Sequence, residues 1–199
     1  MLNFFSGKGS TFIYRKKNII EYGEKPAGYV YLIKKGIVNQ YFVNQNGDIK
    51  TFLILTKGDL FGEIDLLQED KNYVITQAYG DVEIDKISYN LFVNLLEKKP
   101  EIYYYINLML SNKARIFMAQ VVDSSFCDTD HKLRNLLTRL SYQYGEDVQD
   151  GIKIICRFTH EDLARMISST RSTVTRKMKI LENQGIIKIV NHYIIIKVQ

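Results

Sequence analysis

The chain has few of the residues that staple small proteins or carry common catalytic chemistry. Its 199 residues include two cysteines, Cys127 and Cys156, which are too few for a disulfide framework. We see no signal peptide and no uninterrupted apolar run of membrane length, and we therefore expect a cytoplasmic protein with no membrane partner. Three scattered histidines and two cysteines supply no nucleophile–base set, so the sequence predicts that the protein is not an enzyme.

The same shortage restricts the cofactors. An iron–sulfur cluster needs several cysteine thiolates near the N-terminus, and residues 1–98 contain no cysteine. The histidines, His131, His160 and His192, all lie in the C-terminal third, which argues against a haem held by the N-terminal part. Cys127 and His131 are too few ligands for a metal site. We therefore predict no metal, no iron–sulfur cluster and no haem.

Positive charge is concentrated near the C-terminus. Residues 153–199 contain nine Lys/Arg and three Asp/Glu, whereas residues 1–152 contain 18 and 19. The last segment therefore has a surplus of six positive charges, and the rest of the chain has a net charge of −1, which together give the formal net charge of +5. Such a surplus is typical of a surface that binds nucleic-acid phosphates.

Residues 159–183 have the pattern of two short helices joined by a tight turn. Thr159 can cap the first helix, and Thr170 can cap a second that runs from Arg171 to about Asn183. The second helix has apolar residues on one side and arginines and hydroxyls on the other, as a helix that reads the major groove requires. The alternative is an ordinary helical hairpin with a solvated basic face, and the charge surplus favours DNA reading.

A β-hairpin is predicted directly after the second helix. Gly185 ends that helix, and two β-branched runs at 186–190 and 193–198 flank the turn pair Asn191-His192. We therefore assign residues 126–199 to a winged helix–turn–helix.

The N-terminal part of the chain, to about Lys98, is rich in strand patterns. Apolar and polar residues alternate between Gly, Asn and Asp breaks, and Asn46-Gly47 marks one hairpin. The spacing predicts an antiparallel β-roll over residues 1–98, and the fold class of the whole chain is α+β.

Pro100 opens a long helical stretch to roughly Asp123, which we assign with its hinge to residues 99–125. A stripe recurs at spacings of three and four and is interrupted by Lys113; its members are Ile102, Ile106, Met109, Ile116 and Gln120. The stripe could pack on its own roll or on a second copy. We favour the dimer interface, because two copies could address two half-sites one helical turn apart.

The order of β-roll, long helix and winged helix–turn–helix resembles the bacterial CRP/FNR family of transcription regulators, and the resemblance covers nearly the whole chain. GYVYLIKKGIV from residue 28 looks like the family's hydrophobic strand, and GDLFGEIDLL from residue 58 looks like its ligand-pocket segment. TRSTVTRKMKILENQGII from residue 170 is similar to its recognition helix. The resemblance implies a jelly-roll-like (double-stranded β-helix) sensor domain in a homodimeric activator that binds a palindromic operator in double-stranded DNA and contacts RNA polymerase.

The family's base-reading positions fall on Arg171, Ser172, Thr175 and Arg176. We expect Arg176 to read a guanine, and Ser172 stands where relatives often carry glutamate, which predicts a different half-site. Phosphate contacts are expected at Arg171 too, and at Thr173, Lys177, Thr159 and Thr170, although capping alone would explain the last two.

The same resemblance places an effector pocket at Phe61, Gly62, Glu63, Asn72, Tyr73 and Phe117. Members that bind cyclic AMP carry an Arg-Ser pair about ten residues after Phe-Gly-Glu, where the corresponding stretch of this chain is Lys71, Asn72, Tyr73 and Val74. Asparagine cannot replace the bidentate bonds of arginine, and lysine is only a point charge. We therefore expect an unidentified small-molecule effector other than cyclic AMP.

Two further regulators stay open. In one, the pocket is filled by the protein's own side chains, such as Phe117 and Met118, and no effector is needed. In the other, oxidation of Cys127 near the hinge moves the DNA-binding part. The alternative is that Cys127 is an inert or partly buried thiol with no regulatory role.

Overall fold

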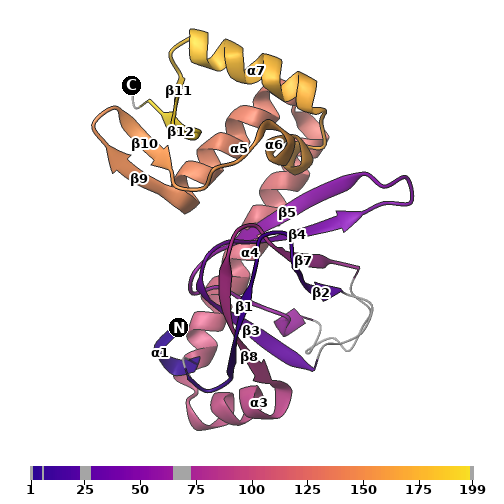
Figure 1. The fold of residues 1–199 in the computed structure, drawn as a ribbon, viewed down its shortest axis with the longest axis vertical. Coiled ribbons are helices and arrows are strands. Elements are labelled where there is room, and N and C mark those ends of the chain that lie inside the picture. The colour runs from indigo at the N-terminus through magenta and orange to yellow at the C-terminus, as the bar shows by residue number, and fades with distance from the viewer. Residues whose placement is uncertain (1, 6, 23–27, 65–72, 198–199) are drawn as a thin grey trace. The chain divides into compact units, whose positions relative to one another are not determined.

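The computed structural model describes residues 2–5, 7–22, 28–64 and 73–197 (Figure 1). The chain forms two compact units, Met1–Ile116 and Phe117–Gln199, and the boundary falls within the long helix α4 (Glu101–Phe126). No helix of the described residues is long and apolar enough to cross a membrane.

Two four-stranded antiparallel sheets form the N-terminal unit (Figure 1). The first has the order β1 (Ser10–Tyr14), β8 (Val82–Ser88), β3 (Tyr29–Lys35) and β6 (Leu60–Phe61). The second has the order β2 (Ile19–Tyr22), β7 (Ile75–Ala78), β4 (Val38–Val43) and β5 (Ile49–Leu55). The β4–β5 hairpin turns at Asn46-Gly47, where Gly47 has a φ of 84°. The predicted antiparallel roll and this hairpin are therefore confirmed.

Among the described residues, the helices that pack on the first sheet are α1 (Leu2–Phe5), α3 (Tyr89–Lys98) and the first half of α4. The ten residues of α3 belong to the segment that the sequence assigned to the strand-rich part. Its buried residues, Phe92, Leu95 and Leu96, recur at spacings of three and one, which places them on one side of a helix. The roll domain thus ends in a helix rather than in a strand.

The core of the N-terminal unit includes the stripe of α4. Phe5, Val30, Leu32, Leu60, Ile87 and the α3 residues pack with Ile102, Ile106 and Met109, which are at most 7% exposed. The prediction that these three α4 residues form the dimer contact is therefore wrong, because their own roll covers them. Ile116 and Gln120 are half-buried and lie beyond this core.

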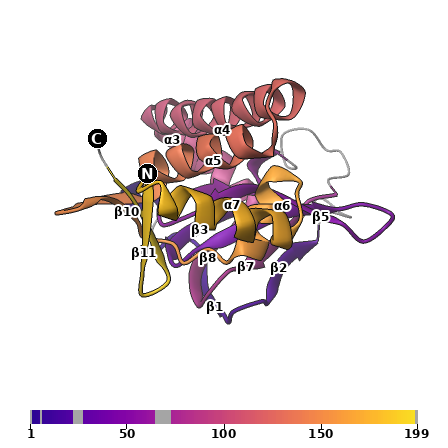
Figure 2. The same ribbon diagram turned by 90° about the horizontal axis from the view of Figure 1, so that it is seen from above.

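The C-terminal unit combines the end of α4 with α5 (Thr129–Tyr144), α6 (His160–Ile167), α7 (Arg171–Asn183) and one sheet. The sheet has the order β11 (Ile187–Val190), β12 (Tyr193–Ile196), β10 (Gly151–Ile154) and β9 (Gly145–Val148). Figure 2 shows α6 and α7 next to each other, with β11 leaving the C-terminal end of α7.

The boundaries predicted for the second helix and the wing are close to those observed. Gly185, with a φ of 70°, follows α7. Asn191 and His192 have φ values of 50° and 67°, the left-handed pair of a type I′ hairpin turn. The helix–turn–helix and its wing are confirmed, whereas the β9–β10 hairpin was not predicted.

Candidate functional site

Both helices of the helix–turn–helix begin at the predicted caps. Thr159 Oγ1 accepts from the backbone N–H of Asp162 at 3.2 Å, and the Asp162 carboxylate accepts in return from the N–H of Thr159 at 2.8 Å. Thr170 Oγ1 accepts from the N–H of Thr173 at 3.2 Å. Each cap satisfies a backbone donor that the first helical turn leaves free. The turn between them bends at Ser168, whose φ is 54°.

The buried side of α7 decides which of its residues face outward. Val174, Met178 and Leu181 are fully buried against the rest of the C-terminal unit. The opposite side exposes all four predicted base-reading residues and one lysine that was left out of the predicted site, namely Arg171, Ser172, Thr175, Arg176 and Lys179. Guanidinium and hydroxyl groups on one side of a packed helix are suited to reading base edges in the major groove.

Hydroxyl groups form a small network at the start of α7. Thr170 Oγ1 lies 3.0 Å from Ser172 Oγ and donates to Thr173 Oγ1 at 2.9 Å. Thr175, one turn further on, contacts a different helix: its Oγ1 lies 2.9 Å from Nδ1 of His160 on α6. His160 was not predicted as a site residue, because nothing local in the sequence joins it to α7.

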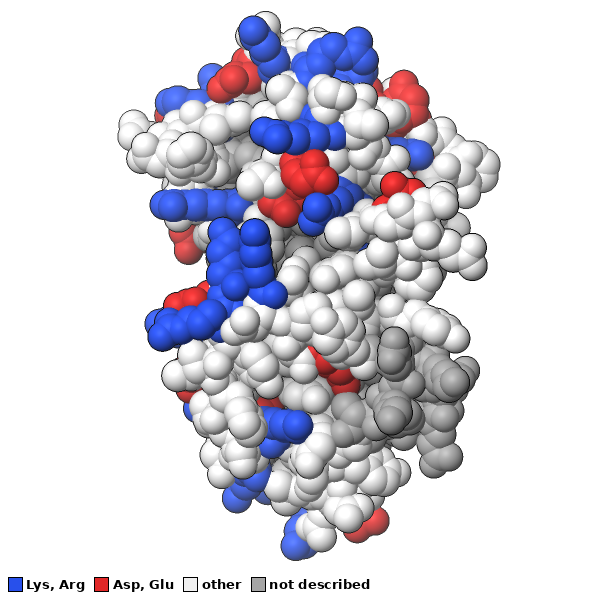
Figure 3. Space-filling view, turned by 45° about the vertical axis from the view of Figure 1, so that its right-hand side comes forward, with Lys and Arg blue, Asp and Glu red and all other residues white. Residues whose placement is uncertain are grey.

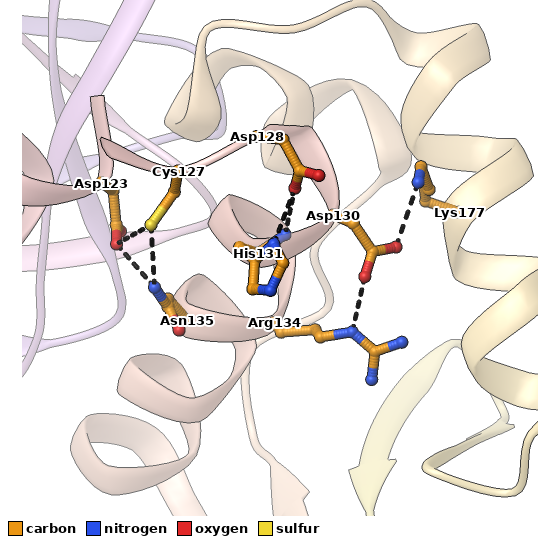
Figure 4. A network of polar contacts seen from close by, with 8 residues as sticks. All are labelled: Asp123, Cys127, Asp128, Asp130, His131, Arg134, Asn135 and Lys177. Carbon is orange, nitrogen blue, oxygen red and sulfur yellow. Dashed lines mark hydrogen bonds and ion pairs between the residues drawn. The ribbon is translucent and has the colours of Figure 1, made fainter. Parts of the chain in front are cut away.

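Lys177 has a structural partner. Its Nζ lies 3.2 Å from Asp130 Oδ1, and Arg134 donates from Nε to Asp130 Oδ2 at 2.7 Å (Figure 4). The hydrogen bond from Arg134, followed by that from Lys177, lowers the pKa of Asp130 below its ordinary value. Lys177 thus fastens α7 to α5, a role that differs from the phosphate contact that the sequence predicted.

Two basic side chains contact Tyr193 of the wing. Lys153 Nζ lies 4.2 Å from the ring centre of Tyr193, and the guanidinium of Arg157 lies 4.6 Å from it. These cation–π contacts hold two positive side chains at the β11–β12 hairpin, to which Tyr193 belongs. Figure 3 shows basic and acidic side chains interspersed on this face of the molecule. Sequence spacing could not pair Lys153, Arg157 and Tyr193, because they come from separate strands and loops.

In the N-terminal unit, the Phe-Gly-Glu segment is tightly held. Phe61 stacks on Tyr31 with ring centres 4.7 Å apart. Gly62 has a φ of 85°, and a Cβ there would lie 2.7 Å from the carbonyl oxygen of Tyr29. Any larger residue would therefore be strained and would clash with β3. The glycine fixes the direction of the following side chain, Glu63.

Glu63 forms a buried ion pair with Lys113 of α4. Lys113 Nζ lies 2.6 Å from Glu63 Oε1 and donates to the carbonyl oxygen of Leu60 at 2.8 Å. The two side chains are 1% and 7% exposed, and no described residue hydrogen-bonds to Glu63 Oε2. Burial raises the pKa of the neighbouring Asp59. Lys113, which interrupts the apolar stripe of α4, thus links this helix to the turn after β6.

The remaining predicted pocket residues are Asn72, Tyr73 and Phe117. Tyr73 is 67% exposed, and Lys71 and Asn72 lie outside the described residues. Phe117 is half-buried on α4 at the start of the other unit. Among the described residues of the N-terminal unit, Phe61, Gly62 and Glu63 therefore lie together, and Tyr73 lies on the surface.

The connection between α4 and α5 is braced by polar contacts (Figure 4). Asp123 Oδ1 accepts from Asn135 Nδ2 at 2.7 Å, and the Arg139 guanidinium lies 2.6 Å from Oδ2 as an ion pair without hydrogen-bond alignment. Asp128 caps α5, and its pKa is lowered by the N–H and then the imidazole of His131.

The two cysteines are free thiols. Cys127 Sγ lies 3.9 Å from the Asp123 carboxylate, whose charge would repel a thiolate. Cys156 is buried, and burial raises its pKa to about 12. Both surroundings favour unreactive thiols.

Comparison with known proteins identifies the class. The chain matches the family model of the Crp-like helix-turn-helix domain over residues 131–198 and that of the cyclic nucleotide-binding domain over residues 12–99. The two matched ranges fall in the two units of the structure, whose boundary lies within α4. The protein is a winged-helix DNA-binding regulator with a cyclic-nucleotide-binding-like domain.

Relatives narrow the class to a family. The chain is 29% identical to the cAMP-activated global transcriptional regulator CRP of Pasteurella multocida, over 86% of this chain and 82% of CRP. It is 26% identical to the cAMP-activated regulator Vfr of Pseudomonas aeruginosa, over 88% and 84%. Its fold matches a CooA mutant from Carboxydothermus hydrogenoformans with a TM-score of 0.83 and 23% identity, covering 96% of this chain and 84% of that one. The chain belongs to the CRP/FNR family of DNA-binding transcription regulators.

Proposed function

We propose that the protein is a homodimer that binds a palindromic operator and contacts RNA polymerase when it activates transcription. The observation that carries this proposal is the outward side of α7, where Arg171 and Arg176 flank hydroxyl side chains on a helix whose other side is buried. Two such helices related by a two-fold axis would read two symmetric half-sites.

The dimer contact is proposed on the side of α4 that the roll leaves uncovered. Four large apolar side chains recur there at helical spacing and are 50–64% exposed: Tyr104, Leu108, Met118 and Val122. Val121 and Phe126 add exposed apolar area at the end of the helix. Exposed apolar residues on one side of a helix are typical of a contact with another copy, and here the polar Ser111 and Arg115 divide them into two pairs.

The proposed effector is a small molecule that lacks the anionic group of a cyclic nucleotide. Glu63 is already neutralised by Lys113, and residues 71–74, which correspond to the phosphate-binding Arg-Ser pair, contain no arginine. Such an effector would act by binding the DNA-competent arrangement more tightly than the other. Because the relatives are named as cAMP-activated, cyclic AMP is the comparison ligand to include.

A second candidate is a regulator of the same fold that needs no effector. The Lys113–Glu63 ion pair favours it, because the carboxylate that a ligand would engage has an internal partner. Thiol-redox control through Cys127 is less well supported, since a carboxylate and an amide already contact the sulfur.

Selection of bound DNA from a random duplex pool tests these proposals. The purified protein is used at fixed salt alone, with cyclic AMP, and with a small-molecule extract of cells, and Arg176→Ala serves as the control. A two-fold symmetric motif enriched only with extract supports an effector-gated dimer. Enrichment by the protein alone supports the effector-independent regulator, and enrichment only with cyclic AMP contradicts the proposed effector class. A wild-type protein that enriches no motif refutes DNA reading.

A further inference from the structure

His160 joins the first helix of the helix–turn–helix to the second. It is the first residue of α6, and its Nδ1 lies 2.9 Å from Thr175 Oγ1 on α7. The reciprocal bonds between Thr159 and Asp162 fix the backbone on either side of it. The half-buried imidazole is therefore presented to α7 from a rigid position.

Thr175 lies in the middle of the outward side of α7. Arg171 and Lys179 lie one turn before and after it, and Arg176 is its neighbour; all are exposed. If this side enters the major groove, as the proposed function requires, then Thr175 faces a base edge.

The contact with His160 decides which part of Thr175 faces outward. A threonine in a helix has two accessible rotamers, because its hydroxyl can bond a carbonyl in the preceding turn. In Thr175 the hydroxyl contacts the imidazole of α6. The hydroxyls of Thr170, Ser172 and Thr173, by contrast, bond to one another within α7.

The two faces of a threonine side chain read different bases. The methyl group contacts the methyl group of thymine, and the hydroxyl donates to or accepts from several base edges. A change of rotamer exchanges the methyl and hydroxyl groups at the surface. The side chain that selects the rotamer therefore influences the base that is read, without a contact of its own to that base.

We propose that His160 is a positioning residue that sets the base preference at the position read by Thr175. Without the imidazole, the Thr175 hydroxyl returns to a carbonyl of its own helix, and the preference at that one position changes. The positions read by Arg176 keep their preference, because the contact that the structure shows for His160 is with Thr175 and not with Arg176.

The test compares operator selection by wild type, His160→Ala, His160→Asn, Thr175→Val and the double variant His160→Ala/Thr175→Val. His131→Asn is the matched control: it removes an imidazole from the same unit, where its partner is Asp128. Thermal unfolding is measured first, so that only folded variants are compared. We expect His160→Ala to change the preference at one symmetric pair of positions roughly three- to tenfold, as for the loss of one hydrogen bond.

His160→Asn is expected to restore the preference, since its amide offers a polar atom near the place of Nδ1. In the Thr175→Val background, His160→Ala should have no further effect at that pair of positions. A uniform loss of affinity for all DNA sequences, with an unchanged motif, would overturn the proposal. His160 would then contact a DNA phosphate or have a purely structural role. The proposal would also be overturned if His160→Ala changed the base preference in the Thr175→Val background. If wild type itself enriches no motif, DNA reading fails, and this inference fails with it.

Discussion

Replacing Lys113 by methionine removes a buried ammonium while keeping most of the side-chain length. In the folded protein the ammonium lies 2.6 Å from Glu63 Oε1, and both side chains are almost completely buried. The variant leaves the Glu63 carboxylate without its charge partner, and its Oε2 already lacks a hydrogen bond from the described residues. We expect a large loss of stability, because the buried Glu63 carboxylate keeps its charge and has lost its partner.

The magnitude follows from the burial of the pair. Removing one member of a buried ion pair typically costs about 3–5 kcal/mol of unfolding free energy, because the remaining charge is uncompensated. Replacing both members by apolar side chains of similar volume is often nearly neutral. Lys113→Met/Glu63→Met should therefore be more stable than Lys113→Met alone. Its free energy of unfolding should lie within about 2 kcal/mol of the wild-type value, because the double variant still loses the hydrogen bond from Lys113 to the Leu60 carbonyl oxygen.

Urea unfolding followed by circular dichroism measures the free energies, and hydrogen exchange of peptides from β6 and α4 assigns the loss to the N-terminal unit. Lys188→Met is the control, because Lys188 pairs with Asp150 at 2.8 Å where both side chains are about half exposed. An exposed pair of this kind should contribute little to stability, so we expect Lys188→Met to unfold at nearly the same urea concentration as wild type.

The reasoning is refuted if Lys113→Met and the double variant lose the same stability. The penalty would then not arise from an uncompensated carboxylate. A loss of less than about 1 kcal/mol in the single variant would show that Glu63 is solvated in solution.

Three further predictions concern the interface and the C-terminal unit. Arg176→Ala should weaken binding to the selected operator by about 1–3 kcal/mol and reduce the sequence preference at one base position. Lys179→Ala should weaken binding to all duplexes and reduce the slope of log affinity against log salt concentration by about 1. Fluorescence anisotropy titration measures both. An equal loss of specificity in the two variants would contradict this. Leu108→Glu should give a folded monomer in sedimentation experiments, and an unchanged dimer would contradict the proposed contact. Arg134 lowers the pKa of Asp130, so the stability that Asp130 adds is present above about pH 4 and is lost as the pH falls through its folded pKa. Asp130→Asn should therefore lower the unfolding temperature at pH 7 but much less near about pH 2, and a pH-independent difference would contradict the ion-pair assignment.

The parts of the protein that local chemistry specifies could be predicted from the sequence. Thr159 and Thr170 are caps, Gly185 ends α7, and Asn191-His192 forms the wing turn. Each signal depends on the conformational preference of a few neighbouring residues, and no distant contact is needed to produce it. The outward side of α7 followed from its helical period in the same way.

The two sides of α4 could not be assigned in this way. Apolar residues occur on both, and the period that selects Ile102, Ile106 and Met109 does not say whether a roll or a second copy covers them. Only the packing of the N-terminal unit shows that these residues are core, and that Leu108 lies on the side left open. Asn72, a central part of the pocket hypothesis, lies outside the described residues.

The sequence by itself determined the order of the elements, the caps and the turn of the DNA-binding unit, and the side of α7 that carries arginine and hydroxyl groups. Only the tertiary structure decided that Lys113 neutralises Glu63, that Lys177 pairs with Asp130, and that His160 holds Thr175. The physical reason is that periodicity and capping are properties of a short segment. The partner of a charge or a hydroxyl, in contrast, depends on which distant segment the fold packs against it.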